Sequence, residues 1–159
     1  MPILYSKGNI SMNLHQKLYC ETTGCRMAYV VKEIIRSLKK RFVEEDIDLT
    51  VEQFFILNIL DNEDGLILQE LAEIVDRDKS AVLRHIDGLE ENHFVTRVQD
   101  ESDKRQKILL ITKPGMKTLE KARAVDQQLD KEINAEVENI ETKEFEDALA
   151  KMYQFLSNQ

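Results

Sequence analysis

The side chains best suited to contacting another molecule lie between Lys79 and about Asn92, where the sequence pattern predicts a helix. Val82, Ile86 and Leu89 recur at spacings of four and three residues and form one apolar side. The other sides carry small, polar, basic or isolated apolar residues: Lys79, Ser80, Ala81, Leu83, Arg84 and His85. Such a helix fits the major groove of duplex DNA, where an arginine can donate two hydrogen bonds to guanine.

Several of these side chains have specific expected roles. Arg84 is expected to contact guanine, and a surface ion pair with Asp87, three positions on, is the alternative. Lys79 and Ser80 suit contacts to phosphates or base edges at the helix start. His85 is a weaker candidate for a phosphate contact, because a single histidine in such a place is more often incidental.

A hairpin with a charged tip is expected after this helix, with strands at Val95–Val98 and Lys107–Ile111. The tip residues that could contact DNA are Asp103, Lys104 and Arg105. Arg105 is the expected finger for the adjacent minor groove, whose negative potential is strongest where the groove is narrow. The alternative is an exposed charged hairpin without a ligand. Arg97, on the first strand, is expected to support the fold or contact a phosphate rather than read a base.

Shorter elements must hold this unit in place. Thr50, followed three residues later by Gln53, is a capping-box pattern that predicts a helix start. Leu66–Ile67 are expected to form a short strand. A short helix is expected over residues 69–75, and Asp78 is the expected N-cap of the helix that follows it.

Longer amphipathic helices are expected on both sides of this unit. One lies within residues 13–45, with a break at Thr23–Gly24. Another begins after Thr112, with Pro114 in its first turn, and a last helix begins at Lys143. Their apolar stripes need a partner, so we expect them to pack together and, across a two-fold axis, onto a second copy of the chain.

Charge is unevenly distributed along the 159 residues, whose formal net charge is −8. Residues 1–76 have a net charge of −5, residues 77–115 of +1 and residues 116–159 of −4. The overall balance argues against a general nucleic-acid coat protein and predicts oriented, salt-sensitive DNA binding. It also supports an alternative, a protein-interaction module that docks its partners through acidic helices.

Other classes of protein find little support. Cys20 and Cys25 are too few for a disulfide framework, so reduced thiols are the simplest interpretation, although their spacing leaves a disulfide between them open. The three histidines are too scattered for a metal motif, and nothing predicts a cofactor. No apolar run approaches the roughly 20 residues that span a bilayer, and residues 1–7 do not resemble a signal peptide, so we expect a cytoplasmic protein. No phosphate loop or nucleophile motif predicts an enzyme.

Four segments in order resemble the multiple antibiotic resistance regulator (MarR) family of bacterial transcription factors. Leu49–Phe54 matches the family's helix start LTxxQ, and Leu71–Glu73 matches LAE in its first reading helix. Asp78–Val82 with Leu89–Glu90 matches its recognition helix. The wing signature DxRxxxLxLTxxG is matched by Asp103–Arg105, Leu109–Thr112 and Gly115.

The resemblance implies a mainly α fold with a small β-wing, that is, a winged helix–turn–helix homodimer with long N- and C-terminal dimerisation helices. We therefore expect an N-terminal arm and dimerisation helix (1–48), a DNA-binding domain (49–115) and C-terminal dimerisation helices (116–159). Members of the family usually repress genes, and many release DNA when a small aromatic or anionic effector binds. A pseudo-palindromic operator follows from two-fold symmetry.

Three positions depart from the family pattern. His93 stands where glycine is usual, which predicts a positive φ that histidine tolerates at some cost. Leu68 stands where a polar residue usually caps the first reading helix. Leu83 stands where the recognition helix commonly has a polar residue; it could touch a thymine methyl group or belong to the partial core.

Two further roles come from the resemblance. Asp103 is expected to pair with a nearby arginine and steady the wing. Cys25, one helical turn before Tyr29, lies near the reactive cysteine of oxidation-sensing members, so a thiol-based redox sensor is an alternative. Lys39 stands near the place of a second tyrosine found in that subgroup, which favours a buried cysteine at the base of the dimer instead.

Overall fold

The computed structural model describes residues 22–100, 103–136 and 142–158. Residues 13–21 of the first predicted helix, Cys20 included, lie outside these ranges. The elements in chain order are α2 (Thr23–Glu44), α3 (Val51–Asn62), α4 (Leu68–Ile74), α5 (Lys79–Glu91), β1 (Val95–Gln99), β2 (Lys107–Ile111), α6 (Lys113–Glu136) and α7 (Thr142–Ser157). They confirm the predicted mainly α fold with a small β-wing.

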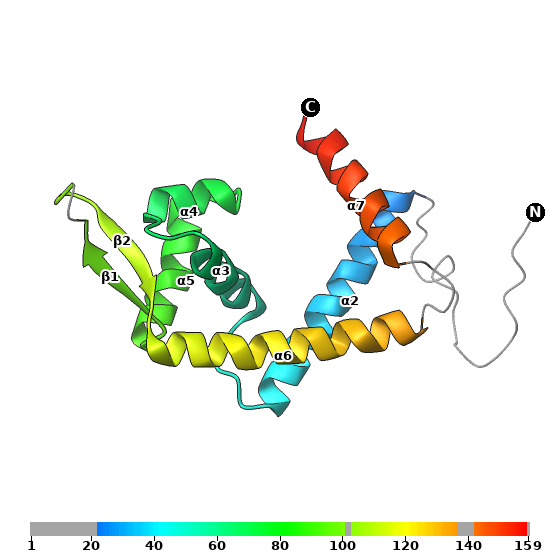
Figure 1. The fold of residues 1–159 in the computed structure, drawn as a ribbon, viewed down its shortest axis with the longest axis horizontal. Helices are drawn as coiled ribbons and strands as arrows, with labels where there is room; N and C mark the ends of the chain where they lie inside the picture. Colours follow the sequence, from blue (N-terminus) through cyan, green and yellow to red (C-terminus); the bar gives the residue numbers. More distant parts are fainter. Residues whose placement is uncertain (1–21, 101–102, 137–141, 159) are drawn as a thin grey trace, which may run out of the picture.

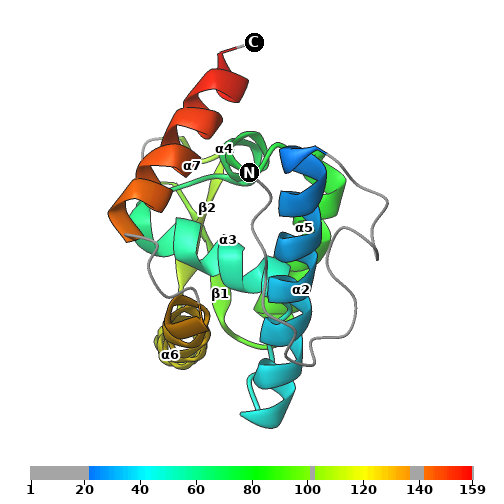
Figure 2. The same cartoon turned by 90° about the vertical axis from the view of Figure 1, so that its right-hand side faces the viewer.

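The long helix α6 organises the molecule (Figure 1). The ribbon and α3, α4 and α5 lie toward its N-terminal end, and α2 crosses it partway along. Figure 2 looks nearly down α6, with α2 and α7 on different sides of the view. The ribbon is antiparallel, with Val95 opposite Ile111 and Gln99 opposite Lys107, and Ile67 adds an isolated bridge to Ile108. The short strand expected at Leu66–Ile67 is therefore a single bridge.

One apolar core joins all of these elements except α7. Its largest fully buried side chains come from α2, α3, α4, α5, β1 and α6: Leu38, Phe42, Leu57, Leu71, Val82, Ile86, Leu89, Val95 and Leu119. The ring of Phe42 on α2 meets the edge of Phe54 on α3, with centroids 5.6 Å apart. α3 thus lies between the helix–turn–helix and the flanking helices, since it contacts α2, α5 and α6.

Local hydrogen bonds begin the helices where the sequence predicts. Thr50 Oγ1 accepts from the Gln53 N–H at 3.1 Å and Gln53 Oε1 accepts from the Thr50 N–H at 2.9 Å, which confirms the capping box. The N-cap of α4 is Ile67, whose side chain cannot accept a hydrogen bond. Its N–H donates to the Glu70 carboxylate at 3.0 Å, so only half of a capping box is present. Leu68, where the family pattern has a polar cap, is the first residue of α4 and not its N-cap.

The junction between α5 and β1 has the positive φ that the family pattern predicts, with His93 at φ +60°. The His93 carbonyl accepts a hydrogen bond from Thr112 Oγ1 at 2.6 Å, which ties this turn to the start of α6. The turn therefore has to keep a conformation that a Cβ atom disfavours.

Replacing His93 with glycine should stabilise the fold by about 1 kcal/mol, because glycine adopts positive φ without the Cβ penalty. The midpoint of urea unfolding measures this change. His93→Ala removes the imidazole but keeps the Cβ, so it should give no such gain. Equal stability of the glycine and alanine variants would show that the backbone conformation is not the cause.

Two clusters of polar side chains fasten α6 to its neighbours. Arg123 donates to Asn58 Oδ1 at 2.8 Å and pairs with Asp61 at 2.7 Å, both on α3. Arg41 on α2 makes a two-point contact with Glu132, at 3.2 and 2.5 Å. The hydrogen bond from Arg41, with a smaller one from Gln128, lowers the pKa of Glu132 from 4.5 to about 2.

The lowered pKa of Glu132 makes the α2–α6 contact sensitive to acid. The contact stabilises the fold above the ordinary glutamate pKa of 4.5, and this stabilisation is lost as the pH falls toward 2. Glu132→Gln should therefore show a smaller fall in unfolding free energy than the parent chain as the pH is lowered over this range. Urea unfolding at each pH measures this free energy. Glu33→Gln, which breaks a single exposed pair with Arg36, serves as the control and should behave like the parent.

The last helix, α7, leaves its apolar side chains open to solvent. The exposed large hydrophobic residues on it are Phe145, Leu149, Met152, Tyr153, Phe155 and Leu156. In the part of the chain that the structure describes, no helix combines the length and apolarity needed to cross a membrane. The apolar face of α7 thus lacks a cover among the residues that the structure describes.

Candidate nucleic-acid interface

Asp78 fixes the start of α5 as the sequence predicts. Its Oδ1 accepts hydrogen bonds from the backbone N–H groups of Ser80 and Ala81, both at 3.0 Å. The apolar side of α5 is buried in the core, so the orientation of the helix about its axis is also fixed.

The opposite face of α5 points away from the core. Its members follow the spacing i, i+3, i+4 and i+7: Ser80, Leu83, Arg84 and Asp87. Lys79 is exposed at the start of the helix. Ala81 and His85 are half-buried and line a cavity of about 440 Å³ with Phe55 of α3. The six residues predicted from the sequence therefore divide into four that are exposed and two on the flank facing α3.

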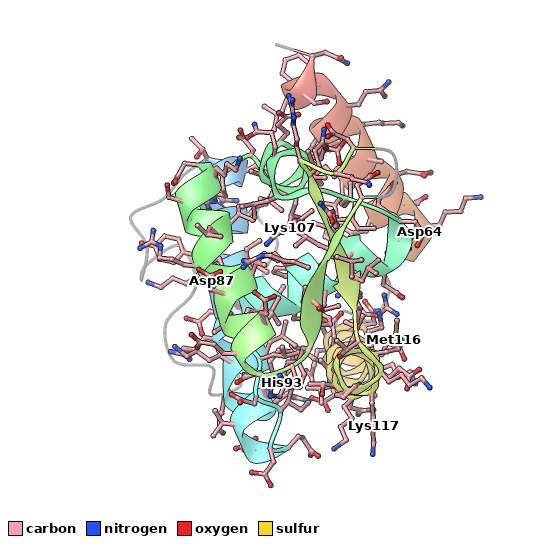
Figure 3. The ribbon with its side chains drawn as sticks, turned by 90° about the vertical axis from the view of Figure 1, so that its left-hand side faces the viewer. Asp64, Asp87, His93, Lys107, Met116 and Lys117 are labelled. Carbon is pink, nitrogen blue, oxygen red and sulfur yellow. The ribbon has the colours of Figure 1, made fainter. Side chains whose placement is uncertain are left out.

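Arg97 links the ribbon to the recognition helix. Its guanidinium donates to Asp87 at 2.5 Å and to Glu90 at 2.7 Å, both on α5. Figure 3 shows Asp87 midway along α5 and His93 where α5 gives way to β1, with the ribbon alongside. Both carboxylates pair with the Arg97 guanidinium, so Arg97 positions the wing against α5.

The same contact settles the partner of Asp87. The sequence leaves open a pair between Arg84 and Asp87, but the Asp87 carboxylate is taken by Arg97. The Arg84 side chain is exposed and makes no ion pair with any residue in the described ranges. Its guanidinium is therefore available at the centre of the outward face of α5.

The wing tip is held by carboxylates that accept from the backbone. Asp103 Oδ1 accepts from the Arg105 N–H and Asp103 Oδ2 accepts from Gln106 Nε2, both at 3.0 Å. The Asp103 N–H donates to Asp100 Oδ1 at 3.0 Å. Asp103 thus steadies the wing through these contacts, and among the described residues no arginine side chain forms an ion pair with it. The tight turn brings the Arg105 N–H, rather than its guanidinium, to the carboxylate.

Basic side chains surround a small cavity between the wing and the helix–turn–helix. The cavity measures about 330 Å³, and its basic lining residues are Lys79, Arg97, Arg105 and Lys107. Lys107 is missing from the residues predicted to contact DNA. Strand alternation places Lys107 on the same face of β2 as the buried Leu109, which could have indicated that it points toward the helices.

Cys25 corrects the expectation of reduced thiols. It is half-buried in the first turn of α2 and is disulfide-bonded. A disulfide was the alternative that the spacing left open. The other cysteine of the chain, Cys20, lies outside the described residues.

A third cavity lies where α2 crosses α6. It measures about 600 Å³ and combines charged and apolar lining residues: Ser37, Lys40, Arg41, Glu44, Glu45, Ile47, Lys121, Ala124, Val125 and Gln128. It lies next to the contact of Arg41 with Glu132, so a molecule bound there would touch the joint between the two helices.

Comparison with known proteins agrees with this architecture. A sequence model of the MarR family matches residues 49–107. The HTH-type transcriptional regulator BilQ of Clostridium symbiosum is 30% identical over 114 residues, which cover 72% of this chain and 78% of BilQ.

Solved structures with the same fold can be superposed on most of the chain. A MarR transcriptional regulator from Methanosarcina mazei Go1 superposes with a TM-score of 0.75 at 21% identity, covering 85% of this chain and 96% of its own. The Staphylococcus aureus MepR–DNA complex gives a TM-score of 0.73 at 22% identity, covering 88% and 100%. With a recognition helix that exposes Lys79 and Arg84, a wing and this relationship to BilQ, the chain belongs to the MarR family and is a DNA-binding transcriptional regulator.

Proposed function

We propose that the chain works as a homodimeric repressor that binds a pseudo-palindromic site in duplex DNA and releases it when a small effector binds. The observation that carries this proposal is that two arginine side chains are exposed, one on the recognition helix and one on the wing. Arg84 lies on the outward face of α5 and Arg105 at the wing tip, and neither side chain is held by another described residue. The major and minor grooves are the surfaces that such a pair fits.

Each predicted contact residue has a role in this proposal. Arg84 reads a guanine, Arg105 enters the minor groove, and Lys79 and Ser80 contact phosphates or base edges at the start of α5. The residues with supporting roles are Ala81, His85, Arg97, Asp103 and Lys104. The acidic remainder of the chain repels phosphate, which keeps the orientation of binding fixed.

The exposed apolar face of α7 supports the homodimer. Phe145, Leu149 and Met152 recur at spacings of four and three and are between 36% and 55% exposed. Val30 and Val31 on α2 are also about half exposed. We propose that residues 1–48 and 116–159 form the dimer and that residues 49–115 bind DNA, with recognition helices about 34–36 Å apart.

The effector is proposed to bind in the α2–α6 cavity, because that cavity lies between the dimerisation helices and the DNA-binding unit. Lys40 and Lys121 suit an anionic group, and Ile47 and Val125 suit an apolar ring. An effector lowers DNA affinity by linkage if it binds more tightly to the arrangement of α2 and α6 that does not fit DNA. We place the protein in the cytoplasm, where a bacterial regulator meets its DNA.

Selection of bound duplexes from a random pool, with sedimentation of the free protein, tests the function. We expect a dimer, two inverted half-sites one helical turn apart, and an affinity that falls steeply with salt. A monomer in solution would contradict the homodimer. Failure to retain any duplex even at low salt would favour the alternative of a winged-helix interaction module that no longer binds DNA.

A thiol-switched repressor is the second candidate, because Cys25 is disulfide-bonded at the start of a helix assigned to the dimer. In this version, the reduced form binds DNA. Peroxide oxidises the Cys25 thiolate to a sulfenic acid and is itself reduced to hydroxide, and a second thiol then displaces water from the sulfenic acid to form the disulfide, which releases DNA. Cys25→Ser should bind DNA without responding to peroxide. If Cys25→Ser still releases DNA on oxidation, the thiol is not the sensor.

A further inference from the structure

We propose that Leu83 determines part of the sequence specificity, by contacting the 5-methyl group of a thymine in the major groove. The inference rests on the DNA-binding function proposed above. It assigns a base-reading role to the residue that departs from the family pattern on α5.

Leu83 leaves part of its apolar side chain open to solvent. It is 37% exposed, and it belongs neither to the buried core nor to the partly buried hydrophobic residues packed against that core. Leu83 is therefore not a member of the buried core, and more than a third of its surface can meet a partner. Contact with water makes its exposed surface unfavourable, and a bound partner would relieve this.

The surroundings of Leu83 identify the chemistry of that partner. Leu83 shares its face with Ser80 and Arg84, and Lys79 stands exposed at the start of the same helix. Asp87, the acidic member of this face, is paired with Arg97, which leaves Arg84 free of it. Exposed cations in a chain with a net charge of −8 suit a polyanion.

Duplex DNA offers a polyanion with an apolar group at the right place. Along the floor of the major groove, the thymine methyl is the apolar feature that distinguishes one base pair from the others. Arg84 follows Leu83 directly in the chain, so a guanine bound by Arg84 lies within one or two base pairs of the base that Leu83 contacts. We infer a half-site in which a thymine is adjacent or nearly adjacent to this guanine.

Replacing thymine with deoxyuridine tests the contact, because it removes only the methyl group. A duplex selected by the parent chain from a random pool is the probe, and each thymine is replaced in turn. At one position of each half-site, affinity should fall about fourfold, the value of one buried methyl-sized group. Replacement in both half-sites should give about a 15-fold loss, because distant contacts add.

Two variants assign the effect to Leu83. Leu83→Ala should still bind the duplex but respond less than twofold to the deoxyuridine at that position. Ile74→Ala, which truncates a 51% exposed apolar side chain on α4, is the matched control and should keep the fourfold response. Anisotropy titrations at one salt concentration provide all of these affinities.

The outcomes separate this inference from the proposed function. Selected duplexes without any methyl-sensitive position, or equal sensitivity in Leu83→Ala and the parent chain, would overturn the role of Leu83 and leave DNA binding intact. If the parent chain selects no duplex, both the proposed function and this inference are wrong.

Discussion

Arg84→Ala should weaken binding to the selected duplex by at least about 30-fold. A bidentate contact between arginine and guanine contributes about 1–3 kcal/mol, and a dimer makes it twice. Each 1.4 kcal/mol corresponds to about a factor of ten in affinity, so a total of about 2 kcal/mol is the lower limit of the loss. Arg84 is exposed and unpaired among the described residues, so the variant should remain folded.

Anisotropy titrations at fixed salt measure this loss, and the sequence preference identifies its origin. If Arg84 reads a base, Arg84→Ala should lose the preference for guanine at one position of each half-site, whereas loss of a phosphate contact would weaken all sequences alike. Arg36→Ala is the matched control, because Arg36 is an exposed arginine of α2 that pairs only with Glu33 one turn away. Equal affinities of Arg84→Ala and Arg36→Ala would show that α5 does not read the site as proposed.

The sequence predicted the elements of the site because their signals are local. The capping box of Thr50 and Gln53 and the cap of Asp78 depend on atoms no more than three residues apart. The buried side of α5 follows from its periodicity alone. A helix cap or a buried helix face depends on only a few neighbouring residues, so the sequence pattern is enough to predict it.

The interactions that the sequence did not predict join residues from different elements. Arg97 meets Asp87 ten positions away, and this contact decides that Arg84 is not held by Asp87. Arg41 meets Glu132 across 91 positions. Charge patterning shows that such partners exist but not which ones meet, since the pairing depends on how β1 lies against α5 and how α2 crosses α6.

Gly115 shows a second limit, because the sequence identified it only as the last residue of the wing signature. In the structure, Gly115 lies in the first turn of α6 directly against the backbone of Phe94. The Gly115 N–H donates to Thr112 Oγ1 at 3.1 Å, and the Thr112 N–H donates to the Phe94 carbonyl at 3.0 Å. The start of α6 is therefore fastened to the residue that leads into β1, at a distance that a side chain would not allow.

Gly115→Ala should destabilise the fold by about 3 kcal/mol or more. An added Cβ would lie 2.0 Å from the Phe94 carbonyl oxygen and 2.8 Å from its carbon. These are backbone atoms, so the clash can be relieved only by moving α6 away from the turn that begins the wing. Urea unfolding measures the loss, and a fall in melting temperature of about 6–12 °C should accompany it for a domain of this size.

The chain provides its own control for this change. At Gly24, in the first turn of α2, an added Cβ meets nothing within 4 Å, so Gly24→Ala should leave stability unchanged or raise it slightly. Because the junction at Gly115 also sets the position of the wing, Gly115→Ala should weaken DNA binding even at temperatures where the variant is folded. A Gly115→Ala variant as stable as Gly24→Ala would show that α6 does not approach Phe94 this closely, and the placement of the wing relative to α6 would have to be revised.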